Sequence, residues 1–103
     1  MAVTRYEFDW DPAKAATNLA KRGIAFEAAM TVFLDPLARS RFDEDNSDDE
    51  MRWVTLGEAR NGLLLVVVHT YIEMAPDRVY VRIISARRPT GREARQYREG
   101  LEL

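Results

Sequence analysis

The longest apolar run in the chain, LLLVVV at residues 63–68, constrains the fold more than any other stretch. Its length suits a strand and falls far short of the roughly 20 residues that cross a bilayer. Because successive side chains of a strand point to opposite faces, this strand is apolar on both of them. We therefore expect it in the middle of a sheet whose second face is also covered.

The residues around this run alternate with a period of two, which predicts further strands near residues 37–42, 51–57 and 78–87. The central strand itself extends over about 63–72, and Asn61-Gly62 before it predicts a tight turn. Alternating aromatic and acidic residues predict one more short strand at residues 6–10. These strands are expected to form a small antiparallel meander.

Two helices are predicted between the first strand and the meander. Asp11 as N-cap and Pro12 at the first helical position predict a helix over about 12–22, with Gly23 after it. Its expected apolar stripe is formed by Ala15, Ala16, Leu19 and Ala20. A second helix follows and ends at Asp35-Pro36, with a weak start at Ala25 and an apolar face of Phe26, Met30 and Phe33.

The C-terminal segment carries a capping box, Thr90-x-x-Glu93, which opens a helix to about residue 99. The whole order predicts an α+β fold in a single domain spanning residues 1–103. An antiparallel sheet is packed with two N-terminal helices and one C-terminal helix.

Composition excludes several kinds of chemistry. The chain has no cysteine, which rules out disulfides, thiolate metal sites and cysteine nucleophiles. With one histidine and an acidic run that lacks the spacing of a calcium loop, we expect no metal and no cofactor. The first ten residues lack the apolar segment of a signal peptide, so a cytoplasmic protein is expected.

Charge is concentrated at two places, although the net charge is only -2. Residues 43–50 carry six carboxylates and no cation, and are predicted to form a solvated loop. Residues 82–98 carry six arginines against one acidic residue, Glu93. Such poles act on association with partners rather than on the fold.

Guanidinium groups match phosphate oxygens in a bidentate way, so the arginines indicate a phosphate-binding face. Arg82 has a defined direction on its strand, and Arg88 shares its parity, so both could converge on one anion while Arg87 points to the other face. The alternative is a basic helix paired with the protein's own acidic loop. Further candidates for phosphate or RNA contact are Lys14, Arg52, Arg60 and a stacking Tyr97, with Arg92, Arg95 and Arg98 as a docking face for RNA or a partner.

His69 is the natural acid–base candidate, since its unperturbed pKa lies near neutrality. The alternative is a buried strand histidine bonded to the backbone. If the substrate is RNA, its own 2'-hydroxyl is the nucleophile, and His69 or Glu50 as base with Arg82 at the phosphate would suffice without a metal. Whether His69 and Arg82 share a sheet face depends on a register that a slip of one residue would reverse.

Three motifs, spread over nearly the whole chain, occur in this order: W-D-P-x-K at residues 10–14, F-x-D-P at 33–36 and R-I-I-S-A-R at 82–87. With the acidic run ending in DDEMRWVTLG and with LLLVVVHT, they resemble the BrnT family of type II toxins. The resemblance implies a RelE-like fold and an endoribonuclease that stops translation. It implies a ribbon-helix-helix partner of the BrnA type, in a 2:2 assembly that represses its own promoter.

By position, the resemblance places the family's characteristic polar residues at Lys14, Asn18, Glu50, Arg52, His69, Arg82, Ser85, Arg87, Glu93 and Tyr97. Three positions depart from the family pattern: Arg22 and Asn46 replace expected histidines, and Leu63 replaces an arginine. These departures keep a second interpretation open, in which a weak or inactive member serves as an antitoxin-binding co-repressor. A third interpretation is a module that only binds nucleic acid.

Overall fold

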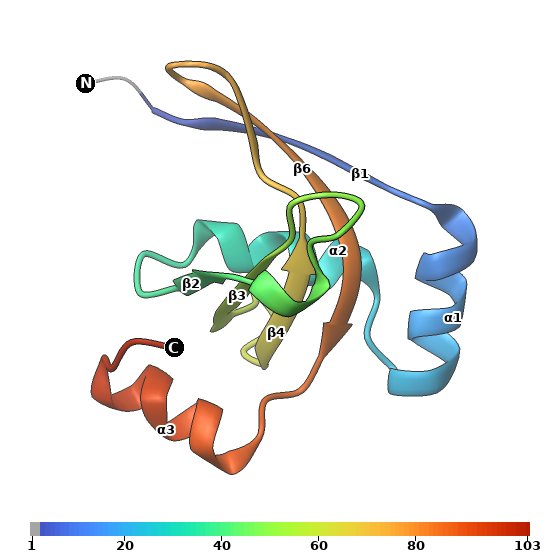
Figure 1. Ribbon diagram of the computed structural model, residues 1–103. Coiled ribbons are helices and arrows are strands. Elements are labelled where there is room, and N and C mark those ends of the chain that lie inside the picture. The colour runs from blue at the N-terminus through green and yellow to red at the C-terminus, as the bar shows by residue number, and fades with distance from the viewer. Residues whose placement is uncertain (1–2) are drawn as a thin grey trace.

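The computed structural model describes residues 3–103 as one six-stranded sheet with helices packed on it (Figure 1). The strands are β1 (Arg5–Trp10), β2 (Arg39–Phe42), β3 (Trp53–Glu58), β4 (Leu64–His69), β5 (Ile72–Ala75) and β6 (Arg78–Arg87). The helices are α1 (Pro12–Arg22), α2 (Phe26–Ala29) and α3 (Gly91–Glu99), with short 3-10 helices η1 (Met30–Leu34) and η2 (Glu44–Asn46). The predicted α+β class is confirmed.

The sheet order is β1-β6-β4-β3-β2, with β5 paired to β6. Strands β2, β3, β4 and β6 form the predicted antiparallel meander. The expectation of a wholly antiparallel sheet is wrong, because β1 pairs with β6 in parallel, from Arg5 beside Arg78 to Trp10 beside Ile83. Alternation within β1 shows that a strand is present but does not say which edge it joins.

Strand β4 lies in the middle of the sheet and is covered on both faces, as its apolar run predicts. Leu65 and Val67 belong to a core that includes Phe26, Ala29 and Val32 from the α2–η1 segment. On the other face, Val66 packs with Val54 and Leu56 beneath Tyr97 of α3 and Leu103. The second face is covered only in part, and β6 beside it keeps an open stretch.

Two irregularities modify the predicted hairpin of residues 63–72 and 78–87. The first strand is interrupted at Thr70, so that β4 and β5 pair in turn with β6. The register also shifts: Val68 pairs with Ser85, but the next residue, His69, pairs with Ile83. Ile84 is therefore an extra residue, a β-bulge, and it changes the parity of everything that follows it on β6.

Helix α1 closes the edge of β6 beyond the point where β1 ends. The buried Asn18 side chain donates to the Ile24 carbonyl at 2.9 Å and accepts from the Ala86 N–H at 3.1 Å. The predicted apolar stripe is largely wrong, because Ala16, Leu19 and Ala20 are exposed and only Ala15 is partly buried against the core. Leu19 is 52% exposed. The buried residue of α1 is instead the polar Asn18, whose side chain binds two buried backbone groups.

The second predicted helix is shorter than expected. Only Phe26–Ala29 is α-helical, and the chain then tightens into η1 as far as Leu34. Ala25 offers no side-chain cap, so the start has little support of its own. In contrast, Asp11 caps α1, and the Thr90–Glu93 capping box of α3 is confirmed. None of the helices within residues 3–103 has the length and apolar character that a membrane span requires.

Asn18→Ala is expected to destabilise the protein by about 3 kcal/mol, because it leaves a buried N–H and a buried carbonyl without partners. Urea unfolding followed by circular dichroism measures the loss. The control is Leu19→Ala on the same helix, which should cost less than about 1 kcal/mol because Leu19 is largely exposed. Equal losses for the two variants would contradict the role given to Asn18.

Candidate functional site

The uncovered face of β6 carries polar residues. Val81 and Ile83 are buried on either side of Arg82, so Arg82 points to the face opposite the α2–η1 core. Asp9 pairs with Arg82 in the β1–β6 register and lies on the same face. There it accepts a hydrogen bond from the Tyr80 hydroxyl at 2.8 Å. Charged side chains of β1 and β6 therefore share this face.

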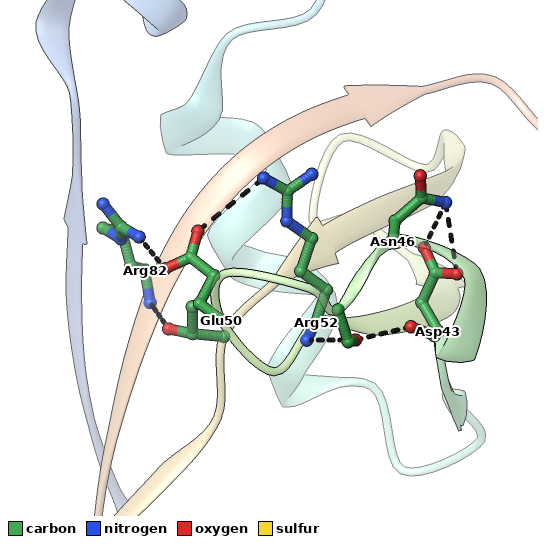
Figure 2. A network of polar contacts seen from close by, with 7 residues as sticks. Asp43, Asn46, Glu50, Arg52 and Arg82 are labelled. Carbon is green, nitrogen blue, oxygen red and sulfur yellow. Dashed lines mark hydrogen bonds and ion pairs between the residues drawn. The ribbon is translucent and has the colours of Figure 1, made fainter.

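Glu50 joins two of the predicted arginines on this face (Figure 2). One carboxylate oxygen accepts a hydrogen bond from Nη2 of Arg82, and the other lies 3.8 Å from Nη2 of Arg52. The three side chains are 28–38% exposed, so the cluster is reachable from solvent. Residues 32 positions apart are thus brought together from β6 and from the loop that crosses in front of it.

The two ends of the acidic loop that carries Glu50 are joined by hydrogen bonds among Asp43, Ser47 and Arg52. The expectation that the whole loop is solvated is therefore wrong. Asp43 is only 8% exposed, and its N–H donates to the Arg52 carbonyl at 2.8 Å. Ser47 Oγ donates to the Asp43 carbonyl at 2.5 Å and accepts from the Arg52 N–H at 3.0 Å. Asn46 donates to both Asp43 carboxylate oxygens, at 3.1 and 3.3 Å. These contacts place Glu50 over β6.

The arrangement combines a proton acceptor with two permanent cations. A carboxylate within reach of a hydroxyl can take its proton, and guanidinium groups can stabilise charge that develops on a phosphorus centre. Within residues 3–103, no group of three or more His, Cys, Asp or Glu side chains is placed to hold a metal ion. The Glu50–Arg82–Arg52 cluster is the candidate site for chemistry because it holds a carboxylate between two guanidinium groups on a solvent-accessible face.

The predicted convergence of Arg82 and Arg88 is wrong. The bulge at Ile84 reverses the parity, so Arg87 shares the face of Arg82, and Arg88 lies beyond the end of the strand. Arg87 in turn forms two hydrogen bonds with Glu93, at 2.8 and 2.9 Å. This bidentate contact is the main cause that lowers the pKa of Glu93 to about 2. Arg87 thereby fastens α3 to the sheet.

Lys14 lies in a basic groove of about 350 Å³ between α1 and β6. The groove is also lined by Lys21, Arg22, Asn18 and Ser85. Arg22, one of the departures from the family pattern, thus adds a cation beside Lys14. Ser85 is three positions beyond Arg82 on the same strand, so the groove adjoins the Glu50 cluster along β6.

The remaining predicted site residues lie elsewhere. Arg60 follows the end of β3 while Arg52 precedes its start, so a strand of about 20 Å separates them. The Tyr97 hydroxyl donates to Asp35 at 2.5 Å, and burial followed by this bond raises the pKa of Tyr97 to about 12. Its partly buried ring packs against Val54, Leu56 and Val66, away from the Glu50 cluster. Three exposed arginines follow along α3: Arg92, Arg95 and Arg98.

His69 is 1% exposed and lies on the opposite sheet face from Arg82. Its Nδ1 is 2.7 Å from the Thr70 carbonyl oxygen, and its Nε2 is 2.6 Å from Thr55 Oγ1. Burial lowers the pKa of His69 to about 4. With both ring nitrogens bonded and no access, His69 lacks what an acid–base group needs to touch RNA. This geometry matches the alternative of a buried strand histidine.

Sequence reasoning missed Asp9, Tyr80, Asp43 and Ser47 as parts of the site. Asp9 and Tyr80 meet through the parallel β1–β6 pairing, which no local sequence pattern indicates. Asp43 and Ser47 lie in an acidic run whose composition favours a solvated loop. The local signal for this contact is the spacing of four residues between Asp43 and Ser47, which lets the serine hydroxyl reach the Asp43 carbonyl.

Fold and site together define a small α+β domain that presents a carboxylate between arginines on one face of its sheet. Residues 10–93 match the sequence profile of the family described as "Ribonuclease toxin, BrnT, of type II toxin-antitoxin system". The chain therefore belongs to the BrnT family of ribonuclease toxins.

A crystal structure of the Brucella abortus ribonuclease toxin, BrnT, has a similar fold, with a TM-score of 0.56 and 20% sequence identity. The similarity covers 84% of this chain and 99% of that one. Among curated protein sequences, none matches the chain. The predicted family is thus confirmed, and membership of a type II system implies an antitoxin partner.

The buried His69 predicts a defined acid sensitivity. Its pKa is about 4 in the folded protein against 6.5 for an ordinary histidine, so the unfolded chain binds the proton first. Folding stability is therefore lost as pH falls from 6.5 to 4, by on the order of 3 kcal/mol. Urea unfolding at pH 7, 5.5 and 4 should show this loss for the wild type. The His69→Gln variant should lack that part of the loss; parallel curves for the two proteins would contradict it.

Proposed function

We propose that the protein is an endoribonuclease that cleaves RNA without a metal ion, at the Glu50–Arg82–Arg52 cluster. The observation that carries this proposal is the position of Glu50, held between two guanidinium groups on the accessible face of β6 (Figure 2). Family membership supports the reaction class, since the family consists of ribonuclease toxins.

In the proposed reaction Glu50 takes the proton of the RNA 2'-hydroxyl as its oxygen attacks the adjacent phosphorus. The bond from phosphorus to the 5'-oxygen breaks, and that oxygen takes a proton from solvent. The products are a 2',3'-cyclic phosphate and a free 5'-hydroxyl. Arg82 and Arg52 stabilise the charge of the pentacoordinate phosphate between these two steps. For this, the phosphate replaces part of the contact between Arg82 and Glu50.

RNA is proposed to follow β6 away from the cluster, along its side facing α1. The groove with Lys14, Lys21 and Arg22 adjoins the cluster and offers cations to the next phosphates. Lys14 and Arg22 have no ion-pair partner among residues 3–103, and the same holds for Arg88. In contrast, Arg87 is engaged by Glu93, and Arg60 lies at the far end of β3.

The biological setting completes the proposal. A single-domain toxin of RelE-like descent cleaves RNA in the cytoplasm and thereby inhibits translation. A ribbon-helix-helix antitoxin of the BrnA type neutralises it in a 2:2 assembly that binds promoter DNA. The exposed arginines of α3, Arg92, Arg95 and Arg98, are proposed as a docking face for RNA or this partner.

A second candidate is a member without catalysis that acts as a co-repressor with its antitoxin. The observation that favours it is internal pairing, since Arg52 and Arg82 already contact Glu50. Asn46, where the family resemblance leads us to expect a histidine, is also bonded to Asp43 rather than free. Activity measurements on the free protein decide between the two candidates.

Arg82→Ala and Glu50→Gln are each expected to lower the rate of RNA cleavage by about 100-fold or more, because one removes charge stabilisation and the other the base. The assay uses antitoxin-free protein and labelled RNA in EDTA, with identification of the cyclic phosphate end. The matched control is Arg78→Ala, which removes another β6 arginine that is paired to a carboxylate, Glu7, at 3.5 Å. This control should retain activity.

Three results would contradict the proposal: no cleavage by wild type at any concentration, full activity of Glu50→Gln, or equal losses for Arg78→Ala and Arg82→Ala. The first of these supports the co-repressor. His69→Gln, checked for folding by circular dichroism, should keep most of the activity. Loss of cleavage in a folded His69→Gln protein would return the base to the histidine.

A further inference from the structure

A second pocket lies on the sheet face opposite the Glu50 cluster. It has a volume of about 460 Å³ and sits between η1, β1, the β2–β3 hairpin and the residues just after β4. Four aromatic side chains line it: Tyr6, Phe33, Trp53 and Tyr71. Tyr6 and Phe33 pack at 5.7 Å between ring centroids, and Trp53 and Tyr71 at 6.4 Å. The pocket is thus walled by two aromatic pairs.

A chain of hydrogen bonds beneath the pocket has a fixed direction. The Thr70 carbonyl can only accept, so Nδ1 of His69 donates to it and Nε2 of the neutral ring accepts from the Thr55 hydroxyl. Thr55 Oγ1 in turn accepts from the Ser40 hydroxyl at 2.7 Å. The Ser40 hydroxyl proton therefore points to Thr55 and not into the pocket. Toward the pocket, Ser40 offers only lone pairs.

The charged groups of the pocket are also acceptors. Two carboxylates, Asp35 and Glu73, line it, and no lysine or arginine does so among residues 3–103. Asp35 already accepts from Tyr97, Leu37 and Glu58, whereas Glu73 is exposed and has no ion-pair partner among the described residues. The pocket therefore combines aromatic faces and two carboxylates with a Ser40 hydroxyl that can only accept.

We propose that this pocket binds the guanidinium group of an arginine from a protein partner. Guanidinium carries five donors and no acceptor, it is always charged, and it stacks on aromatic rings. Cation–π attraction to the ring faces adds to the contact with Glu73. Lysine has the charge without the planar fork. A nucleotide has the wrong complement, because its phosphates would approach two carboxylates.

The partner is the antitoxin, and only this identification rests on the proposed function. Thr55 lies between Val54 and Leu56, which pack on the other core, so its side chain points to the face of β3 opposite theirs. Arg82 points away from that pocket face. An antitoxin arginine in the pocket would thus hold the partner without occupying the Glu50 cluster. Binding of the partner and of RNA are separable on this surface.

N-acetyl-L-arginine amide is the probe for the pocket itself. In nitrogen-edited NMR spectra of the whole protein, it should shift the Trp53 indole N–H and the amides of Ser40, Thr55 and Glu73 in a saturable way. The neutral analogue N-acetyl-citrulline amide should bind about five- to tenfold more weakly, because it lacks the charge. Adenosine and uridine test the competing possibility of a nucleobase.

The proposal is overturned if the arginine probe shifts none of these signals at a concentration where free protein remains folded. It is equally overturned if citrulline binds as well as arginine, or if a nucleoside binds these residues more tightly. The last result would make the pocket a site for an RNA base. A shift at Trp10, whose ring contacts Phe26 in the core, would indicate a global change and not binding.

The Glu73→Lys variant tests whether the pocket contributes to binding of the antitoxin. This substitution replaces the exposed carboxylate by a cation and should lower the affinity for a BrnA-type antitoxin by about tenfold or more, as measured by calorimetry. The control is Glu27→Lys, an equal charge change at an exposed position of α2. RNA cleavage by the free protein should be unchanged in both. An unchanged affinity for Glu73→Lys would overturn the docking role, whether or not the protein cleaves RNA.

Discussion

The burial of β4 on both faces is the constraint on which the rest of the structure depends. A strand with Leu65 and Val67 on one face and Val66 on the other needs two covering layers. The α2–η1 segment provides the first, and α3 with the C-terminal residues provides the second. Helix α3 contacts β3, and its Tyr97 packs with Leu103 against the cluster of Val66, whereas Figure 1 shows α3 far from the first half of β6. The candidate active site lies on the part of β6 that α3 does not cover.

The uncovered part of β6 also explains why the chain carries both an acidic run, residues 43–50, and a cluster of arginines at residues 82–98. The acidic loop crosses the open face and delivers Glu50 to Arg82, while the Asp43–Ser47–Arg52 contacts join its two ends. Most other carboxylates of the run stay in solvent. A carboxylate held in this way is oriented before substrate arrives, which favours catalysis over flexible binding. Through Glu50 the acidic run thus contributes to the candidate site as well as balancing the charge of the arginines.

Much of the fold was predictable, because it rests on local signals. The alternation, the apolar run, the Asp11 and Thr90 caps and the order of elements all follow from neighbouring residues. The prediction of Arg88 beside Arg82 was wrong for a different reason. A single bulge at Ile84 arises from how β4, β5 and β6 fit together, and it moves Arg87 onto the face instead. Parallel pairing of β1 is likewise a long-range choice that no local pattern encodes.

His69, the single histidine of the chain, shows that a residue type suited to catalysis can have a structural role instead. Its ordinary pKa makes His69 the obvious acid–base candidate, yet the strand parity that buries Leu65 and Val67 buries His69 with them. Held neutral by burial, its ring can only accept at Nε2, and this sets the direction of the Thr55 and Ser40 hydroxyls. The buried ring therefore shapes a surface that it does not reach. It makes Ser40 an acceptor toward the pocket, which adds to the carboxylates of Asp35 and Glu73 in favouring a cation over an anion.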